Sequence, residues 1–310
     1  MRDAKILIGP STFGTIDRTP LERLEQAGLT VIPNPFGRKF EKDELLRLLP
    51  GVQGIIAGME PLTRDVLEQS QLRAIARCGV GLENVDLDAA RELGISVSST
   101  PEAPTAAVAE LTVGSMITLL RGVPQMDRNM HAGHWSKHIG IQIGGKTIAI
   151  VGFGRIGRKV AKLLRPFNAR CVAVDPALSG RVDGVEVLTL REALAQADVV
   201  TLHASGGTEI LGEDELRLMK RGAFLLNAGR SGLVNEASLC KALDNGTVAG
   251  AWIDSFAQEP YDGPLVRYPQ VILTPHVGSA SVECRRQMEL EAVENLLRAL
   301  RPWISQELNQ

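Results

Sequence analysis

Short apolar segments rich in β-branched residues alternate with amphipathic segments along most of the chain, in two separate series. The first series runs from AKILI at residues 4–8 to ISVSS at residues 95–99, and the second from KTIAIVG at 146–152 to VAGAWID at 248–254. This alternation is typical of βαβ units, which build a parallel sheet covered by helices on both faces. The sequence therefore predicts an α/β protein with two doubly wound parallel-sheet domains and an active-site cleft between them.

The length of the chain and the segments outside the two series set the domain boundaries. The 310 residues exceed one ordinary core. Residues 103–122 are Ala- and Leu-rich and apolar on more than one face, which is typical of a buried helix at an interface. The run that begins at Ser281 has apolar residues at helical spacing, so we expect it to pack back on the first domain. The predicted domains are residues 1–98 with 283–310, and residues 99–282.

The balance of charge and the cysteines limit the partners and the compartment. The chain carries 34 Lys and Arg against 36 Asp and Glu with no long run of one sign, which argues against nucleic acid or a membrane surface as partner. No apolar run approaches the length of a membrane span. The four cysteines are widely spaced without a CxxC pair, so we expect reduced thiols and a cytoplasmic protein.

A glycine-rich stretch, VGFGRIG, follows the apolar run KTIAI and opens an amphipathic segment. In such a GxGxxG pattern Gly152 would permit a tight turn, Gly154 would let the backbone approach a pyrophosphate, and Gly157 would allow close packing of helix on strand. The N-terminus of the helix would offer free N–H groups to the anion. The alternative is a tight strand-to-helix turn without a ligand.

Asp175 ends the next predicted strand, RCVAVD, 23 residues after Gly152. A carboxylate at this place would accept hydrogen bonds from the 2′-hydroxyl of an adenosine ribose and repel a 2′-phosphate. No Arg or Lys follows until Arg181, so the sequence favours NAD over NADP. The alternative is a solvated residue at the end of a strand.

Three stretches place polar residues directly after apolar runs, near the expected crevice: NAGRSGLVNE with Arg230, WIDSFAQEP with Asp254 and Glu259, and TPHVGSAS with His276. Together with ARCGVGLENVDLDAA, VAELTVG and VGFGRIG, in this order along the chain, they resemble the D-isomer-specific 2-hydroxyacid dehydrogenases, most closely the D-3-phosphoglycerate dehydrogenase branch. The resemblance implies a flavodoxin-like substrate-binding first domain and a Rossmann NAD-binding second domain. With Gln310 as the last residue, we expect a short form without the regulatory domain of some relatives.

The resemblance also implies the roles of these residues. Arg230 would bind the carboxylate and C2 oxygen of the substrate, Glu259 would orient His276, and His276 would be the acid/base. Asp254 would hold the nicotinamide side of the cofactor. The chemistry agrees, because alcohol oxidation needs a proton acceptor that works near neutral pH and a guanidinium grips a carboxylate in bidentate fashion. The alternatives are a packed histidine, a surface arginine and a loop carboxylate.

Further cofactor and substrate residues are predicted from the same motifs. The predicted cofactor site also includes Arg155, Ile156, Pro176, His203, Ala204, Ala228, Gly229, Gly278 and Ser279. His203 is the rival general base, although the resemblance places it beside the cofactor. In the first domain the amides of Gly79, Val80 and Gly81 would form a nest for the substrate carboxylate, with added charge from Arg77. A solvated strand-end arginine is the alternative for Arg77.

The segment HAGHWSKH contains His131, His134 and His138, a spacing that suggests a metal site. We predict none, because Gly133 interrupts the helix that would align them and no carboxylate or cysteine accompanies them. The resemblance places this segment, with its tryptophan, in a dimerisation arm. It therefore implies a homodimer.

Three departures from the family pattern leave the substrate open. Pro104 stands where an asparagine is common, HASGGTE where a proline-rich turn commonly follows the strand histidine, and Glu83 where an aspartate is usual. The sequence predicts an oxidoreductase that transfers a hydride between NAD and an anionic D-2-hydroxy acid, such as 3-phosphoglycerate, and its 2-oxo acid. The alternatives are a glyoxylate/hydroxypyruvate reductase and an NAD-sensing binding protein similar to the corepressors of this family.

Overall fold

The computed structural model describes residues 4–306, and the side chains up to residue 302. The chain divides into two compact units, Met1–Pro104 with Ala280–Gln310, and Thr105–Ser279. The divisions predicted from the sequence are 98/99 and 282/283. The outermost residues of the predicted first domain, 1–3 and 307–310, lie outside the described residues.

The first unit contains a five-stranded parallel sheet with the order β2-β1-β3-β4-β5. Its strands are β1 (Lys5–Ile8), β2 (Thr30–Ile32), β3 (Val52–Ala57), β4 (Ala74–Arg77) and β5 (Ser96–Ser98). Its helices are α1 (Thr19–Gln26), α2 (Lys42–Leu48), α3 (Arg64–Glu68), α4 (Leu87–Glu92) and α11 (Val282–Gln306). Helix α11 contacts β3, β4, β5 and α1, so the prediction that the C-terminal run returns to the first unit is confirmed.

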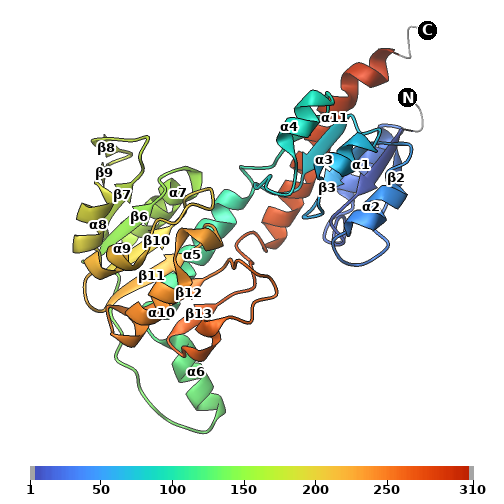
Figure 1. Ribbon diagram of the computed structural model, residues 1–310. Helices are drawn as coiled ribbons and strands as arrows, with labels where there is room; N and C mark the ends of the chain where they lie inside the picture. Colours follow the sequence, from blue (N-terminus) through green and yellow to red (C-terminus); the bar gives the residue numbers. More distant parts are fainter. Residues whose placement is uncertain (1–3, 307–310) are drawn as a thin grey trace. The chain divides into compact units, whose positions relative to one another are not determined.

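The second unit contains an eight-stranded sheet with the order β13-β12-β11-β10-β6-β7-β9-β8 (Figure 1). Its strands are β6 (Thr147–Val151), β7 (Arg170–Val174), β8 (Arg181–Val182), β9 (Val185–Val187), β10 (Val199–Leu202), β11 (Ala223–Asn227), β12 (Val248–Ile253) and β13 (Val271–Leu273). Its helices are α5 (Pro104–Leu120), α6 (Val123–His131), α7 (Arg155–Leu164), α8 (Leu190–Gln196), α9 (Glu213–Leu218) and α10 (Glu236–Asp244). All neighbouring strands are parallel except β8 and β9, so the predicted doubly wound architecture is confirmed.

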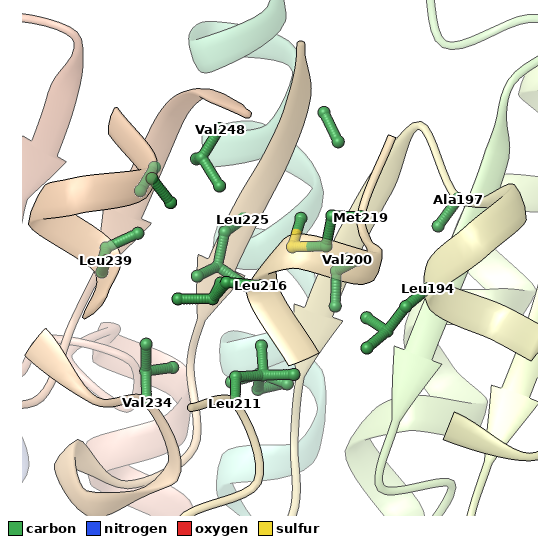
Figure 2. Close-up of a cluster of buried hydrophobic side chains, with 14 of the residues drawn as sticks. Leu194, Ala197, Val200, Leu211, Leu216, Met219, Leu225, Val234, Leu239 and Val248 are labelled. Carbon is green, nitrogen blue, oxygen red and sulfur yellow. The ribbon is translucent and has the colours of Figure 1, made fainter. Parts of the chain in front are cut away.

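Continuous apolar strands arise because the second sheet is covered on both faces. On β6, Ile148 and Ile150 join one hydrophobic cluster, and Ala149 and Val151 join the other. Neighbouring residues of a strand point to opposite faces, so a strand buried on both sides is apolar at every position. Figure 2 shows the second of these clusters, in which Leu225 of β11 is fully buried among side chains from neighbouring strands and helices.

Helix α5 is the long apolar helix that residues 103–122 predict. Val108, Ala109, Met116 and Leu120 are among its buried side chains. In the part of the chain that the structure describes, no single helix is long and apolar enough to cross a bilayer, and α5 with α6 would reach that length only as a pair bent by 64°.

Candidate active site

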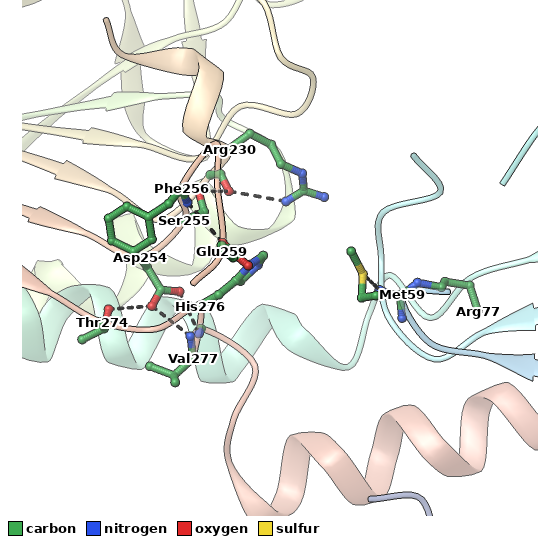
Figure 3. Close-up of polar contacts among 12 residues, drawn as sticks. Met59, Arg77, Arg230, Asp254, Ser255, Phe256, Glu259, Thr274, His276 and Val277 are labelled. Atoms are coloured by element: carbon green, nitrogen blue, oxygen red, sulfur yellow. Dashed lines mark hydrogen bonds and ion pairs between the residues drawn. The ribbon is translucent and has the colours of Figure 1, made fainter. Parts of the chain in front are cut away.

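Loops after three neighbouring strands carry the predicted chemical groups. Arg230 follows β11, Asp254 and Glu259 follow β12, and His276 follows β13. These strands are adjacent and parallel, so their carboxyl ends lie at one edge of the sheet. Figure 3 shows Arg230, Glu259 and His276 extending from loops at this edge. The fold thus brings together three residues that lie up to 46 positions apart in the sequence, from 230 to 276.

His276 and Glu259 form a hydrogen-bonded pair. Nδ1 of His276 lies 3.1 Å from Oε1 and 3.2 Å from Oε2 of Glu259. The backbone N–H of Phe256 donates to the same Oε1 at 3.1 Å, which orients the carboxylate. With side chains 48% and 43% exposed, the pair contributes little to stability. The pair has a chemical consequence. When the N–H of Nδ1 donates its hydrogen bond to the carboxylate, Nε2 is left as the ring nitrogen that can take up or release a proton.

Arg230 is half-buried on a loop that Asn227 supports. Nδ2 of Asn227 donates to the carbonyl of Arg230 at 2.9 Å, and its Oδ1 accepts from the N–H of Gly229 at 3.0 Å. Nη1 of Arg230 approaches the carbonyl of Gly229 at 3.4 Å. Asn227 was not predicted from the sequence, in which its signal is a polar residue that ends the apolar run AFLL.

Asp254 is a buried carboxylate, 3% exposed. Its oxygens accept hydrogen bonds from the hydroxyl of Thr274 at 2.6 Å and from the backbone N–H groups of Val277 at 2.9 Å and Gly278 at 2.8 Å (Figure 3). The loop after β13 is therefore tied to the end of β12. The predicted cofactor residue Ser279 follows this loop, half-buried, as the last residue of the second unit.

The glycine-rich turn after β6 has little room at two of its three glycines. Gly152 has a φ of +87°, and a Cβ on it would overlap the backbone of Ala204. A Cβ on Gly157 would overlap the carbonyl oxygen of Gly152.

Gly154 differs, because a Cβ there would meet no atom within 4 Å. It is exposed, as is Arg155, and it caps α7, which continues through the half-buried Ile156. The first N–H groups of a helix have no partner within the helix. An open approach to such groups fits the pyrophosphate of a dinucleotide.

Asp175 lies at the end of β7, close to the glycine-rich turn. Its Oδ2 accepts from the N–H of Phe153 at 3.0 Å, and its Oδ1 accepts from the N–H of Ala177 at 3.0 Å. The side chain is only half-buried, and Pro176 beside it is exposed. A carboxylate has about four acceptor positions, so these two bonds leave capacity for ribose hydroxyls.

His203 lies at the end of β10, and its neighbour Ala204 contacts the glycine-rich turn. Nε2 of His203 lies 3.0 Å from the hydroxyl of Thr201, and Nδ1 is buried without a hydrogen-bond partner among the described residues. Burial lowers the pKa of His203 to about 3. So weak a proton acceptor argues against His203 as the rival general base.

Ala228 lies in the loop that follows β11 and donates its N–H to the carbonyl of Leu202 at 3.2 Å.

In the first unit, one backbone amide of the predicted anion nest is hydrogen-bonded within the protein and stabilises the loop after β4. The N–H of Gly79 donates to the hydroxyl of the fully buried Thr100 at 2.8 Å, so the expectation that this amide faces a substrate is corrected. The N–H groups of Val80 and Gly81 make no hydrogen bond within residues 4–306. They remain the amides that an anion could bind. Thr100 was not predicted from the sequence, in which its place after a predicted strand is the only signal.

Arg77 is 8% exposed, and its guanidinium donates to the carbonyl of Cys78 and to the sulfur of Met59 at 2.8 Å. These contacts stabilise the same loop from inside the unit.

In the second unit, His131 pairs with Asp127 at 3.6 Å. Among the residues that the structure describes, no group of three or more His, Cys, Asp or Glu could hold a metal ion.

Comparison with known proteins identifies the family. Residues 113–278 match the family described as "D-isomer specific 2-hydroxyacid dehydrogenase, NAD binding domain". The chain belongs to this family. D-3-phosphoglycerate dehydrogenase of Methanocaldococcus jannaschii is 35% identical over 272 residues, which are 84% of this chain and 52% of that protein. The chain spans about half the length of the curated relatives it matches.

Solved structures resemble the whole chain. The TT0316 protein of Thermus thermophilus is 35% identical with a TM-score of 0.88, covering 96% of this chain and 97% of that one. A glyoxylate reductase of Paecilomyes thermophila is 30% identical with a TM-score of 0.84, covering 97% and 96%. The family assignment and the two-domain α/β architecture of the sequence analysis are confirmed.

Alanine substitutions at two glycines of the turn are expected to separate stability from cofactor binding. Gly157→Ala should lower the free energy of unfolding by about 1–3 kcal/mol, because its Cβ overlaps backbone. Gly154→Ala should change it by less than about 0.5 kcal/mol but weaken NADH binding, because its Cβ would enter the open space that is expected to hold the pyrophosphate. Urea denaturation and NADH fluorescence titration measure the two effects. Equal losses of stability in both variants would contradict this assignment.

The lowered pKa of His203 predicts a sensitivity to acid. Because its pKa falls from 6.5 to about 3 in the folded protein, the unfolded chain binds a proton below pH 6.5 that the folded chain does not. Between pH 7 and pH 5 this should lower the free energy of unfolding by about 2 kcal/mol. His203→Gln should lose correspondingly less stability than the wild type over this range in urea denaturation without cofactor. The same loss in both proteins would show that His203 titrates normally.

Proposed function

We propose that the protein is an NAD-dependent dehydrogenase that interconverts a D-2-hydroxy acid and its 2-oxo acid. The observation that carries the proposal is the imidazole of His276 held by the carboxylate of Glu259 at the same sheet edge as Arg230. The family assignment supports it.

The residues of the chain would divide the reaction between proton transfer and charge stabilisation. Nε2 of His276 takes the proton of the C2 hydroxyl during oxidation and returns it during reduction. The carboxylate of Glu259 stabilises the imidazolium that exists while His276 holds this proton. The guanidinium of Arg230 binds the substrate carboxylate and polarises the C2 carbonyl. When bound, the nicotinamide accepts or supplies the hydride.

The cofactor and substrate follow from the two units. The second unit would bind NAD in preference to NADP, because the carboxylate of Asp175 would repel a 2′-phosphate. In the first unit, the amides of Val80 and Gly81 would be available to an anionic group of a ligand. The names of the curated relatives favour 3-phosphoglycerate or a similar anionic acid. The similarity to a glyoxylate reductase keeps glyoxylate or hydroxypyruvate as the second candidate.

A homodimer is the proposed assembly. Met130 is 52% exposed, Trp135 81% and Ile139 94%, in a segment that also exposes Val123 and Ile141. Large apolar side chains gathered at a surface favour a protein partner. The compartment stays a prediction, which rests on the spacing of the cysteines.

Activity measurements test the proposed reaction. His276→Ala should lower kcat by about a hundredfold to ten-thousandfold, while the dissociation constant of NADH stays within about twofold, because the imidazole serves proton transfer. The assay uses 3-phosphohydroxypyruvate, hydroxypyruvate, glyoxylate, pyruvate and sulfopyruvate under one condition, each with NADH and with NADPH.

Turnover of His276→Ala within a few-fold of the wild type would overturn the assignment of the base. If the wild type reduces none of the five acids yet binds NADH and a protein partner in a nucleotide-dependent manner, the NAD-sensing alternative holds instead.

Sedimentation tests the assembly. A chain of 33.4 kDa should sediment as a species of twice that mass, and the double variant Trp135→Glu, Ile139→Glu should sediment as a monomer, because it places charge on the exposed apolar segment. Sedimentation of the wild type as a monomer at micromolar concentration would contradict the dimer.

A further inference from the structure

The backbone of His276 lies in a conformation that needs support. Its φ is +54°, in the left-handed region that residues with a Cβ rarely adopt, and its N–H donates to the carbonyl of Thr274 at 2.8 Å. Such a conformation costs free energy and persists only where the surroundings hold it in place. The direction of the imidazole, and so its meeting with Glu259, depends on this backbone.

The carboxylate of Asp254 supplies this support from both sides of His276. Before His276, the hydroxyl of Thr274 donates to Oδ1; after it, the N–H of Val277 donates to Oδ1 and that of Gly278 to Oδ2. Asp254 is buried at the end of β12. One fixed anion thus holds both ends of the turn that carries the imidazole.

A buried tryptophan sets the direction of the bond from Thr274. Nε1–H of Trp252 donates to the hydroxyl oxygen of Thr274 at 2.9 Å, and Trp252 has no exposed surface. An indole nitrogen can only donate, so the hydroxyl proton of Thr274 is directed to Asp254, where the distance is 2.6 Å. The order of donation along the chain is Trp252 to Thr274 to Asp254.

We propose that Thr274 is a positioning residue, which acts through Asp254 to keep the imidazole of His276 within hydrogen-bond distance of the carboxylate of Glu259. The inference rests on the proposed function of His276 as the acid/base. It differs from the role that the family resemblance implies for Asp254, which is a contact to the nicotinamide. Loss of the Thr274 hydroxyl removes one donor from the carboxylate and releases the side of the turn that precedes His276. The hydrogen bond between the imidazole and the carboxylate of Glu259 is then formed for a smaller fraction of the time. Turnover falls, although the cofactor site is intact.

A matched pair of variants tests the proposal. Thr274→Val keeps the shape of the side chain but has no hydroxyl, and should lower kcat by about tenfold or more. Thr274→Ser keeps the hydroxyl and should retain most of the wild-type kcat. In both variants the dissociation constant of NADH should stay within about twofold of the wild-type value. A kcat of Thr274→Val within twofold of wild type would overturn the proposal, as would a rise in the NADH dissociation constant that accounts for the whole loss.

A readout that needs no turnover separates this inference from the proposed function. The chain has five histidines, so the ring-nitrogen signals of His276 can be assigned in ¹⁵N-histidine-labelled protein by comparison with His276→Ala. In Thr274→Val these signals should move toward their position in Glu259→Gln, at one pH, whether or not any substrate is turned over. Signals at the wild-type position would overturn the positioning role even if kcat falls.

A second variant covers the case in which Thr274→Val does not fold. Asp254→Asn preserves the shape of the side chain but replaces one acceptor oxygen with a donor, so it cannot serve all three donors. Because Asp254 is also a predicted cofactor residue, this variant is judged by the His276 ring signals alone. A shift toward the Glu259→Gln position supports the proposal, and unchanged signals overturn it.

Discussion

Parallel pairing of β6, β10, β11, β12 and β13 sends the carboxyl end of each strand to the same edge of the second sheet. Every polar group of the candidate site in this unit follows one of these strands or the adjoining β7. The glycine-rich turn contacts the end of β10, and the loop after β13 is bonded to the end of β12. The site therefore depends on strand order before it depends on any one side chain.

Two kinds of constraint hold the loops at this edge. Around Gly152 and Gly157 it is lack of space, because a Cβ would overlap the backbone of Ala204 at the first glycine and the carbonyl oxygen of Gly152 at the second. Around Asp254 it is charge, because three donors converge on one buried carboxylate. A hydrogen bond to a charged group contributes about 1.5–3 kcal/mol, and the backbone of His276 costs about 1–3 kcal/mol. The bonds are thus sufficient to hold the strained turn.

Alternation of apolar and amphipathic segments was enough to predict both sheets, the long helix α5 and the return of α11, because each depends on regular periodicity. The antiparallel β8–β9 hairpin was not predicted from the sequence. Its turn, Asp183–Gly184, has φ values of +51° and +81°, and a DG dipeptide between short apolar runs was the available signal. Gly79 shows the opposite error. Its pattern suggested an anion nest, but its amide is bonded to Thr100, a partner 21 residues away that no local pattern indicates.

By itself, the sequence determined the fold class, the family, the dinucleotide-type turn and the identity of Arg230, Glu259 and His276 as candidates, because motif spacing and periodicity are local properties of a chain. Only the tertiary structure decided how those groups are held. That Asn227 supports the Arg230 loop, that burial depresses the pKa of His203, and that Trp252, Thr274 and Asp254 form a directed chain depend on distances between segments and on exclusion of water. Neither distance nor burial is a function of neighbours in sequence, so both had to come from packing.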